Sequence, residues 1–213
     1  MTRPLALLLL LLSLLPAAAC AQALAPPVEG VDYVAIPGGE PWLADGRIEV
    51  AELFAYTCHH CADFAPQLEA WKRRQPADVR VAYVPAAYDP RDGYARAYFA
   101  AEQLGVVGKL HAPLFRAIHE AQSVPMGNAS DGELATFAAD EGVDAAKFAA
   151  AMASPAVAAK MQRARAFAIA SGMEGTPTLV VAGKYRVQAR THEDALRIAG
   201  QLVAMERAAR KPR

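Results

Sequence analysis

The chain is predicted to fold as one α/β structure, a mixed β-sheet interrupted by a block of helices. Two observations lead to this fold class. Short apolar runs of strand length stand near the front and near the end of the chain, and Ala-rich segments with helical spacing fill residues 91–172 between them. The expected order is strand, strand, helix, strand, a helical block, strand, strand and helix. Such an order brings strands from both ends of the chain into one sheet.

The composition excludes several classes of protein. Of the 213 residues 54% are apolar, and 22 basic residues balance 22 acidic ones. A disordered chain needs low hydrophobicity and a high net charge, and a general nucleic-acid binder carries a basic excess. Three cysteines are too few for a small disulfide-dense scaffold. We therefore expect a globular protein with no nucleic-acid partner.

The first residues are predicted to be a secretory leader rather than part of the fold. Arg3 is followed by the apolar run Leu5–Leu15 and then by small residues. Cleavage after Ala23 would remove residues 1–23. Alternatively, Ala17-Ala18-Ala19-Cys20 resembles a lipoprotein box, in which case residues 1–19 are removed and Cys20 carries a lipid. In both cases the chain is exported to the periplasm, soluble or anchored through Cys20, and the folded body keeps two cysteines.

The front of the body is expected to contain strands over residues 33–36, 48–56 and 79–84, with a helix between the second and the third. The helix begins at Cys58, because Phe64, Leu68 and Trp71 then fall on one helical face. The helical block has Gly or Pro breaks at residues 105, 108, 125, 127, 142 and 155.

The end of the body returns to strand patterns. Thr178–Ala182 reads as a buried strand, and Gly183-Lys184 reads as the turn of a hairpin whose second strand is Tyr185–Val187. Thr191 can cap the last helix, which has Ile198 and Leu202 on its inner face.

The candidate chemical centre is Cys58-His59-His60-Cys61, at the junction of a buried strand and a helix. Free N–H groups and the positive end of the helix dipole favour a thiolate at a helix start. Cys58 is therefore expected to be the exposed, attacking sulfur, with Cys61 one turn inside. His60 can donate a hydrogen bond or positive charge to the thiolate. A stabilised thiolate favours the reduced form, which makes the disulfide a strong oxidant.

Other interpretations of this motif are a structural disulfide and half of a zinc site. A zinc site lacks support because no second Cys pair exists and His111, His119 and His192 show no ligand spacing. Haem attachment needs a His directly after the second Cys, where Ala62 stands. His59 taken alone reads as an exposed loop residue. We expect no metal and no cofactor, since the disulfide itself is the redox group.

Two segments resemble one known family. Residues 52–61, which read Glu-Leu-Phe-Ala-Tyr-Thr-Cys-His-His-Cys and are followed by Pro66, are similar to the active-site segment of thioredoxin-fold proteins. With the leader, the helical block and Gly175-Thr176-Pro177-Thr178, this segment resembles the DsbA-like periplasmic thiol:disulfide oxidoreductases. The resemblance implies a thioredoxin-like domain made of residues 24–90 and 173–210. The helical domain inserted into it comprises residues 91–172 and caps the active-site face.

The resemblance also implies roles for single residues. Cys58 matches the family's nucleophile, Cys61 its buried partner and His60 the histidine that tunes the thiolate. Pro177 matches the cis-proline that faces the disulfide, and Thr176 would pair its backbone with an extended substrate chain.

Three positions allow a second interpretation or depart from the usual residues of the family. Glu52 resembles the family's buried acid beneath the active site, which could relay a proton to Cys61; an exposed strand-edge glutamate is the other interpretation. His59 stands where the family's usual Cys-Pro-His-Cys has proline, and it adds a titratable group on the substrate side. Thr176 stands where a typical member has Val, whereas isomerase relatives have Thr.

The implied function is an enzyme that donates the Cys58–Cys61 disulfide to reduced, newly exported proteins. A DsbB-type quinone-linked membrane oxidase would then reoxidise the pair. One alternative is a periplasmic disulfide isomerase or reductase, and another is a non-enzymatic binding module with a structural disulfide. Known isomerases dimerise through a separate N-terminal domain, for which the stretch before the first expected strand is too short. We therefore expect a monomer.

Overall fold

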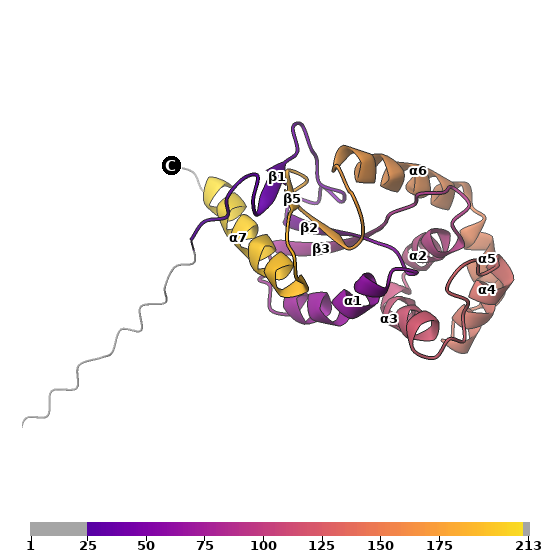
Figure 1. The fold of residues 1–213 in the computed structure, drawn as a ribbon. Helices are drawn as coiled ribbons and strands as arrows, with labels where there is room; N and C mark the ends of the chain where they lie inside the picture. The colour runs from indigo at the N-terminus through magenta and orange to yellow at the C-terminus, as the bar shows by residue number, and fades with distance from the viewer. Residues whose placement is uncertain (1–24, 211–213) are drawn as a thin grey trace, which may run out of the picture.

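The computed structural model describes residues 25–210 and contains one five-stranded sheet with seven helices (Figure 1). The strands are β1 (Tyr33–Ala35), β2 (Ile48–Phe54), β3 (Val79–Pro85), β4 (Thr178–Val181) and β5 (Tyr185–Val187). The helices are α1 (His59–Lys72), α2 (Gly93–Gln103), α3 (Val107–His119), α4 (Asp131–Asp140), α5 (Ala145–Met152), α6 (Pro155–Ala170) and α7 (His192–Arg210).

The sheet is mixed and has the strand order β1-β5-β4-β2-β3. Only β2 and β3 run parallel, and α1 connects them as a crossover helix. The other neighbouring strands are antiparallel. All seven residues of β2 are buried, because β2 lies inside the sheet and helices cover both faces. The two cysteines therefore follow directly after the most enclosed strand of the sheet.

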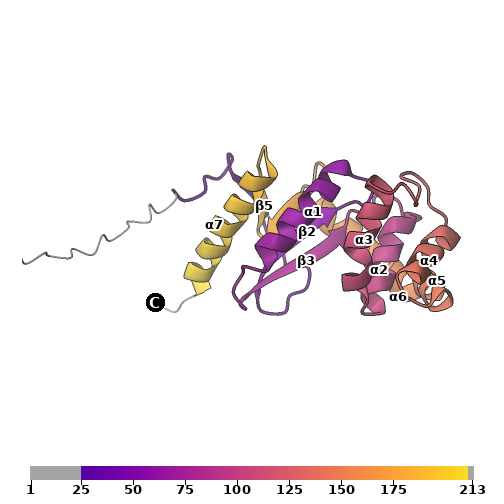
Figure 2. The same cartoon turned by 90° about the horizontal axis from the view of Figure 1, so that it is seen from below.

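Helices pack on both sides of this sheet. In Figures 1 and 2, α1 and α7 lie on one face and α6 lies on the other. The helices α2 to α5 gather beyond one end of the sheet. All five helices α2 to α6 lie between β3 and β4 in the sequence, and the described residues 86–177 contain no strand. The fold is thus a thioredoxin-like mixed sheet with a helical insertion, as the sequence predicts.

The hairpin between β4 and β5 has a turn that only glycine can complete. Ala182 and Gly183 both have positive φ, at 53° and 71°. A Cβ atom on Gly183 would lie 2.1 Å from the carbonyl carbon of Glu40, so the loop before β2 packs directly on this glycine. The hairpin expected at Gly183-Lys184 is confirmed.

Aromatic side chains join the sheet to the inserted helices. The ring of Phe54, at the end of β2, lies 5.4 Å from that of Tyr98 on α2 and 6.0 Å from that of Phe115 on α3. Trp42, from the loop before β2, packs on Phe99 and Phe167. One apolar core therefore extends from the sheet into the helical block.

Most of the expected elements are present, with ends that differ by one or two residues. The expected break at Gly108 is wrong, because Gly108 is the second residue of α3. A glycine weakens a helix chiefly in its interior. Gly108 lies in the first turn, where the backbone N–H groups have no partner within the helix in any case, so it does not end the helix. The predicted leader and Cys20 lie outside the described residues. None of the helices within residues 25–210 combines the length and the apolar character needed to cross a membrane.

Candidate active site

The two cysteines stand where β2 passes into α1. Cys58 is the N-cap residue of α1, with an extended backbone (φ −86°, ψ 117°). Its carbonyl oxygen accepts hydrogen bonds from the N–H groups of Cys61 (3.1 Å) and Ala62 (3.2 Å). The helix therefore starts directly after Cys58, so this residue stands at the end of the helix that carries the free N–H groups of the first turn.

The two thiols have different environments. Both are free thiols; Cys58 is half-buried, whereas Cys61 has no exposed surface. Burial is the main cause that raises the pKa of the Cys61 thiol well above its usual range, and the charge of Glu52 adds to this effect. Cys58 is thus the sulfur that a second molecule can reach.

The loop before β4 lies against Cys58, 118 residues away in the sequence. The Cys58 thiol donates a hydrogen bond to the carbonyl oxygen of Thr176 at 3.2 Å. The Thr176–Pro177 peptide bond is cis, as predicted. The pairing of β4 with β2 begins only at Thr178, so the backbone of Thr176 lies outside the ladder. The structure thus brings Cys58 together with the Thr176–Pro177 segment, as the resemblance implies.

Glu52 is buried in the middle of the sheet and is only 1% exposed, so the alternative of an exposed strand-edge glutamate is wrong. One of its carboxyl oxygens, Oε1, has no hydrogen-bond partner. Burial is the largest cause that raises the pKa of Glu52 to about 8, and the charges of Glu69 and Cys58 add to it. At neutral pH this carboxyl group is therefore mostly protonated.

Glu52 has polar neighbours on the adjacent strand and on α1. In the β2–β3 register it stands opposite Tyr83, whose hydroxyl donates a hydrogen bond to Glu69. Glu69 also accepts a hydrogen bond from Lys72 at 2.9 Å. Glu69 and Lys72 are partly exposed, whereas Tyr83 and Glu52 are buried.

Four of the five histidines of the chain border the cysteine pair. His59 and His60 are exposed at the start of α1, and His59 lies 3.4 Å from the carboxylate of Asp63. The ring of His119, at the end of α3, lies 5.7 Å from that of His59, and the ring of His192, at the start of α7, lies 6.4 Å from that of His60. The sequence analysis missed His119 and His192, because only the folded chain brings the ends of α3 and α7 to this place.

Tyr88 is a third residue near the cysteines that could not be recognised from the sequence. It lies in the loop after β3 and is 59% exposed. Burial and the charges of Cys58 and Cys61 raise the pKa of its phenol. Its hydroxyl lies 4.0 Å from the sulfur of Met173, just before the Thr176–Pro177 loop.

A hollow of about 250 Å³ lies next to Thr176, whose carbonyl oxygen accepts the hydrogen bond of the Cys58 thiol. It is lined by side chains from the start of α1, the Thr176–Pro177 loop and the start of α7, among them His60, Phe64, Pro177, Arg190 and His192. A larger hollow of about 660 Å³ lies along β3 and includes neither cysteine. The smaller hollow is not lined by Cys58 or Cys61 either, but it is lined by His60, next to Cys61, and by Thr176, which accepts the hydrogen bond of Cys58, so we take that one as part of the site.

Comparison with known proteins agrees with this geometry. The model of the DSBA-like thioredoxin domain family matches residues 92–199. The thiol:disulfide interchange protein DsbA of Pseudomonas aeruginosa is 36% identical over 186 residues, which cover 85% of this chain and 87% of that protein. The crystal structure of the oxidoreductase DsbA from Xylella fastidiosa superposes with a TM-score of 0.82 at 49% identity, over 85% of this chain and 98% of that one.

A second solved structure of a DsbA protein also matches this chain. The crystal structure of DsbA from Pseudomonas aeruginosa has a TM-score of 0.78 at 36% identity, over 86% of this chain and 96% of that one. The matches extend over both the sheet that carries the cysteines and the inserted helices. On fold, on the position of Cys58 and Cys61 and on these matches, the chain belongs to the DsbA-like family of thiol:disulfide oxidoreductases.

Proposed function

We propose that this chain introduces disulfide bonds into newly exported proteins by donating the disulfide of Cys58 and Cys61. One observation carries the proposal: an accessible sulfur at a helix start lies directly above a fully buried one. A structural disulfide has no need of this asymmetry, whereas an exchange reaction needs one sulfur to be attacked and the other to leave.

The reaction proceeds in two exchanges. A thiolate of the substrate attacks Cys58 in the oxidised enzyme, the bond between Cys58 and Cys61 breaks, and a mixed disulfide forms. A second substrate thiolate then attacks the substrate sulfur and releases Cys58. The substrate loses two electrons and two protons, which the cysteine pair receives. A DsbB-type quinone-linked membrane oxidase restores the disulfide.

We assign to Glu52 the transfer of the proton to Cys61. The buried Cys61 thiolate that leaves in the first exchange is unfavourable, as the raised pKa of this thiol indicates. Glu52 is buried on the strand below it and holds a proton at neutral pH. Proton transfer from the carboxyl group to the sulfur removes the buried charge as it forms.

The substrate chain is proposed to lie along Thr176 and Pro177. The backbone of Thr176 can pair with an extended chain in the manner of an added strand. Pro177 has no N–H group, so it donates no hydrogen bond to the sulfurs. His60 and His59 border this edge; we assign to His60 the stabilisation of the Cys58 thiolate and to His59 contact with the substrate. Residues 91–172 are proposed as the inserted domain between residues 24–90 and 173–210, and α3 brings it to the edge of the site.

The proposal is tested by incubating the oxidised protein with a reduced, unfolded secretory protein and following disulfide formation. We expect the substrate to become oxidised while Cys58 and Cys61 become reduced in equal amount. In the reduced protein iodoacetamide should modify Cys58 at least about tenfold faster than Cys61, since only the thiolate of an accessible sulfur reacts. Cys58→Ser should abolish substrate oxidation. If the pair instead resists both the substrate and mild reductants, it is a structural disulfide.

The location of the protein is also a proposal. We infer export to the periplasm, with Cys20 either removed with the leader or retained as a lipid attachment site. Expression of the full chain followed by mass measurement of the mature protein separates the two. Cleavage after Ala23 gives a protein without Cys20, whereas a lipidated protein starts at Cys20 and moves to the aqueous fraction in Cys20→Ser.

A further inference from the structure

Among the residues that the structure describes, the hollow of about 250 Å³ next to Thr176 is lined by basic side chains and by no acidic one. Three ionisable side chains line it, His60, Arg190 and His192, and all three are basic. Arg190 is exposed, and within residues 25–210 it forms no hydrogen bond or ion pair. A permanent positive charge without a counterion therefore stands at the edge of the proposed substrate path.

The acidic residues that follow in α7 do not neutralise this charge. The carboxylate of Asp194 lies 3.1 Å from Arg197, and Glu193 lines a separate hollow together with Arg74. His192 accepts a hydrogen bond at Nδ1 from the amide of Gln67 at 3.3 Å, because a side-chain NH₂ group can only donate. The proton of this imidazole is therefore on Nε2, where it can serve as a further donor.

The position of the reacting sulfur fixes which part of a substrate reaches this hollow. A substrate cysteine must meet Cys58, whose thiol is 3.2 Å from the Thr176 carbonyl oxygen. In an extended chain each residue advances about 3.3 Å, so residues two positions apart point to the same side and are separated by about 7 Å. A side chain two residues from the substrate cysteine thus comes to the hollow that Thr176, Pro177 and Arg190 share.

We propose that this hollow is a carboxylate-binding subsite, and that the enzyme prefers substrate segments with Asp or Glu two residues from the reactive cysteine. The inference rests on the proposed function, because it assumes that the substrate lies along Thr176 and Pro177. The guanidinium group of Arg190 presents paired N–H donors that match a carboxylate, and the imidazoles of His60 and His192 add donors beside it. The apolar walls Phe64 and Pro177 can receive the methylene groups of the same side chain.

The test uses single-cysteine peptides that differ only in the residues two positions before and two positions after the cysteine, which are Glu, Gln or Lys. The oxidised protein is mixed with excess peptide, and its reduction is followed by mass spectrometry after acid quenching. Neighbouring charge changes the reactivity of the peptide thiol itself. Each rate is therefore divided by the rate of the same peptide with hydroxyethyl disulfide, a small neutral reagent.

We expect a Glu peptide to react about threefold to tenfold faster than its Lys counterpart for at least one of the two positions, as one partly exposed ion pair allows. The ratio of the Glu-peptide rate to the Lys-peptide rate should fall in 0.5 M salt, because salt screens exposed charges. It should approach one in Arg190→Gln, persist in Arg190→Lys and reverse in Arg190→Glu. Arg74→Gln removes another exposed arginine beyond the far end of α1 and should keep the wild-type ratio.

A ratio near one in the wild-type protein, or the same ratio in Arg190→Gln, overturns the carboxylate subsite. Failure of the proposed function looks different, since the wild-type protein would then not react with the neutral Gln peptides either. A Glu preference that Arg74→Gln abolishes as completely as Arg190→Gln would mean that overall charge, and not this hollow, selects the substrate.

Discussion

Glu52 shows how a single residue can oppose stability while it supports chemistry. A carboxyl group on a fully buried strand with one unpartnered oxygen costs free energy, and within residues 25–210 Glu52 forms no ion pair. The fold tolerates Glu52 by keeping it protonated, as its raised pKa of about 8 indicates. A proton held at this depth, on the strand that leads to the cysteines, is what the proposed transfer to Cys61 requires.

This protonation makes the stability of the reduced protein depend on pH. In the unfolded chain the carboxyl ionises near its usual value of 4.5, whereas in the fold it ionises near 8. The folded state therefore holds more protons between these values, and the contribution of Glu52 to stability falls as pH rises from 4.5 to 8. Glu52→Gln, which is always neutral, should exceed the wild type at pH 7.5 by a few kcal/mol.

Urea denaturation of both reduced proteins at pH 4 and pH 7.5 checks this prediction. At pH 4 the Glu52 carboxyl group is mostly protonated in both the folded and the unfolded protein. The wild type and Glu52→Gln should then have nearly equal stability. A difference that is the same at the two pH values would show that the variant acts through packing and not through ionisation. Glu193→Gln, a change in an exposed glutamate of α7, serves as the control and should alter neither value appreciably.

The site was predictable from the sequence only where residues are neighbours or where a resemblance connects them. The placement of Cys58 at a helix start follows from the change of period after β2, and the burial of Cys61 follows from its position one turn later. The contact of Cys58 with Thr176 came from the resemblance. His119, His192, Tyr88 and Arg190 could not be found in this way, because three separate loops and helix ends meet at the cysteines only in the folded chain.

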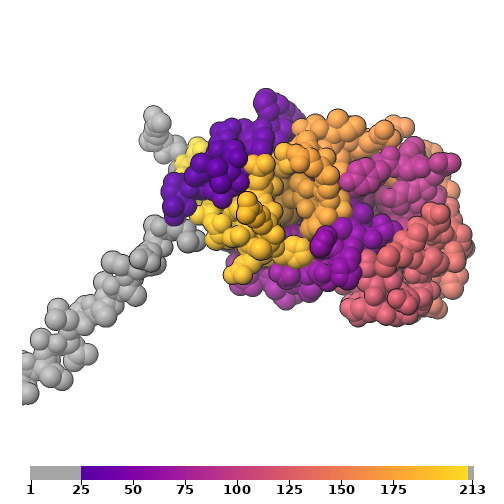
Figure 3. Space-filling view, viewed as in Figure 1, coloured from indigo at the N-terminus to yellow at the C-terminus, as the bar shows by residue number. Residues whose placement is uncertain are grey.

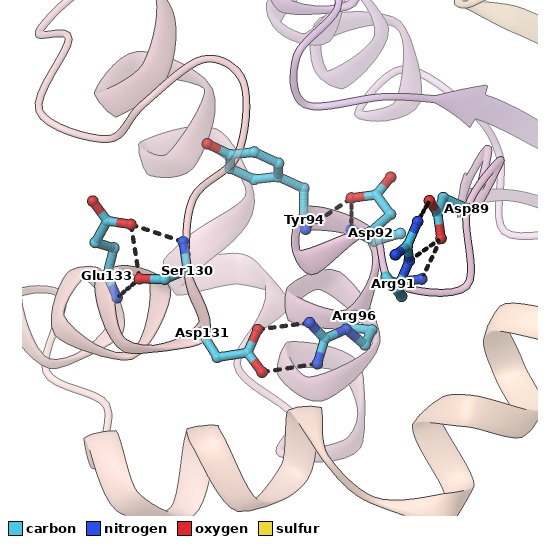
Figure 4. Close-up of polar contacts among 9 residues, drawn as sticks. Asp89, Arg91, Asp92, Tyr94, Arg96, Ser130, Asp131 and Glu133 are labelled. Carbon is cyan, nitrogen blue, oxygen red and sulfur yellow. Dashed lines mark hydrogen bonds and ion pairs between the residues drawn. The ribbon is translucent and has the colours of Figure 1, made fainter.

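At the scale of single elements, local hydrogen bonds define the helices of the insertion. Figure 4 shows two of these helix starts. The carboxylate of Asp92 accepts hydrogen bonds from the N–H groups of Tyr94 and Ala95 at the start of α2. At the start of α4, Ser130 and Glu133 form a capping box, in which each side chain bonds to the backbone of the other residue. Beside this box a two-point ion pair joins Arg96 on α2 to Asp131 on α4.

These contacts explain which element boundaries the sequence could predict. Glycine and proline correctly mark the gap between α3 and α4 and the break at Gly142. The expected break at Gly105 correctly marks the gap between α2 and α3, but the first residue of α3 could not be predicted, because its N-cap residue Val106 makes no side-chain cap bond. Its position is set by the packing of Leu110, Leu114 and Ile118, which are buried in the core. Tertiary packing replaces the local signal at this boundary.

We predict that Ser130→Ala lowers the free energy of unfolding by about 1 kcal/mol, since it removes the N-cap acceptor of α4. Ser130→Thr and Ser130→Asp keep an acceptor and should recover most of the loss. Ser123→Ala changes an exposed serine in the loop before α4 that caps no helix, and it should be nearly neutral. Chemical denaturation measures all four variants. A loss of the same size in Ser123→Ala would assign the effect to the loop and not to the cap.

At the scale of the whole molecule, the question is whether the sheet and the helical insertion unfold together. Figure 3 shows the two parts in continuous contact over one surface. Beneath it, Phe54 from β2 packs on Tyr98 and Phe115 from the inserted helices. The ring of Trp42 lies 4.0 Å from the guanidinium carbon of Arg163 on α6, and this arginine also donates a hydrogen bond to the Trp42 carbonyl oxygen. The interface is part of a single core rather than a contact between separate cores.

We therefore predict one cooperative unfolding transition for the whole of the described chain. Trp71, which is buried on α1, reports on the sheet side, and Trp42 reports on its contact with α2 and α6, whereas most of the far-ultraviolet circular dichroism comes from the helices of the insertion. In urea the fluorescence and circular dichroism curves should coincide, as a two-state transition requires.

Phe54→Ala removes the ring that joins the two parts and should cost about 3 to 5 kcal/mol, with both curves shifted equally. Phe54→Leu should shift both curves by less, and Ile169→Ala, which changes a 70% exposed side chain on α6, should leave them in place. Helical signal that survives after the tryptophan signal is lost would show that the insertion is an independent folding unit, and the shared core would then not be what holds it against the active-site face.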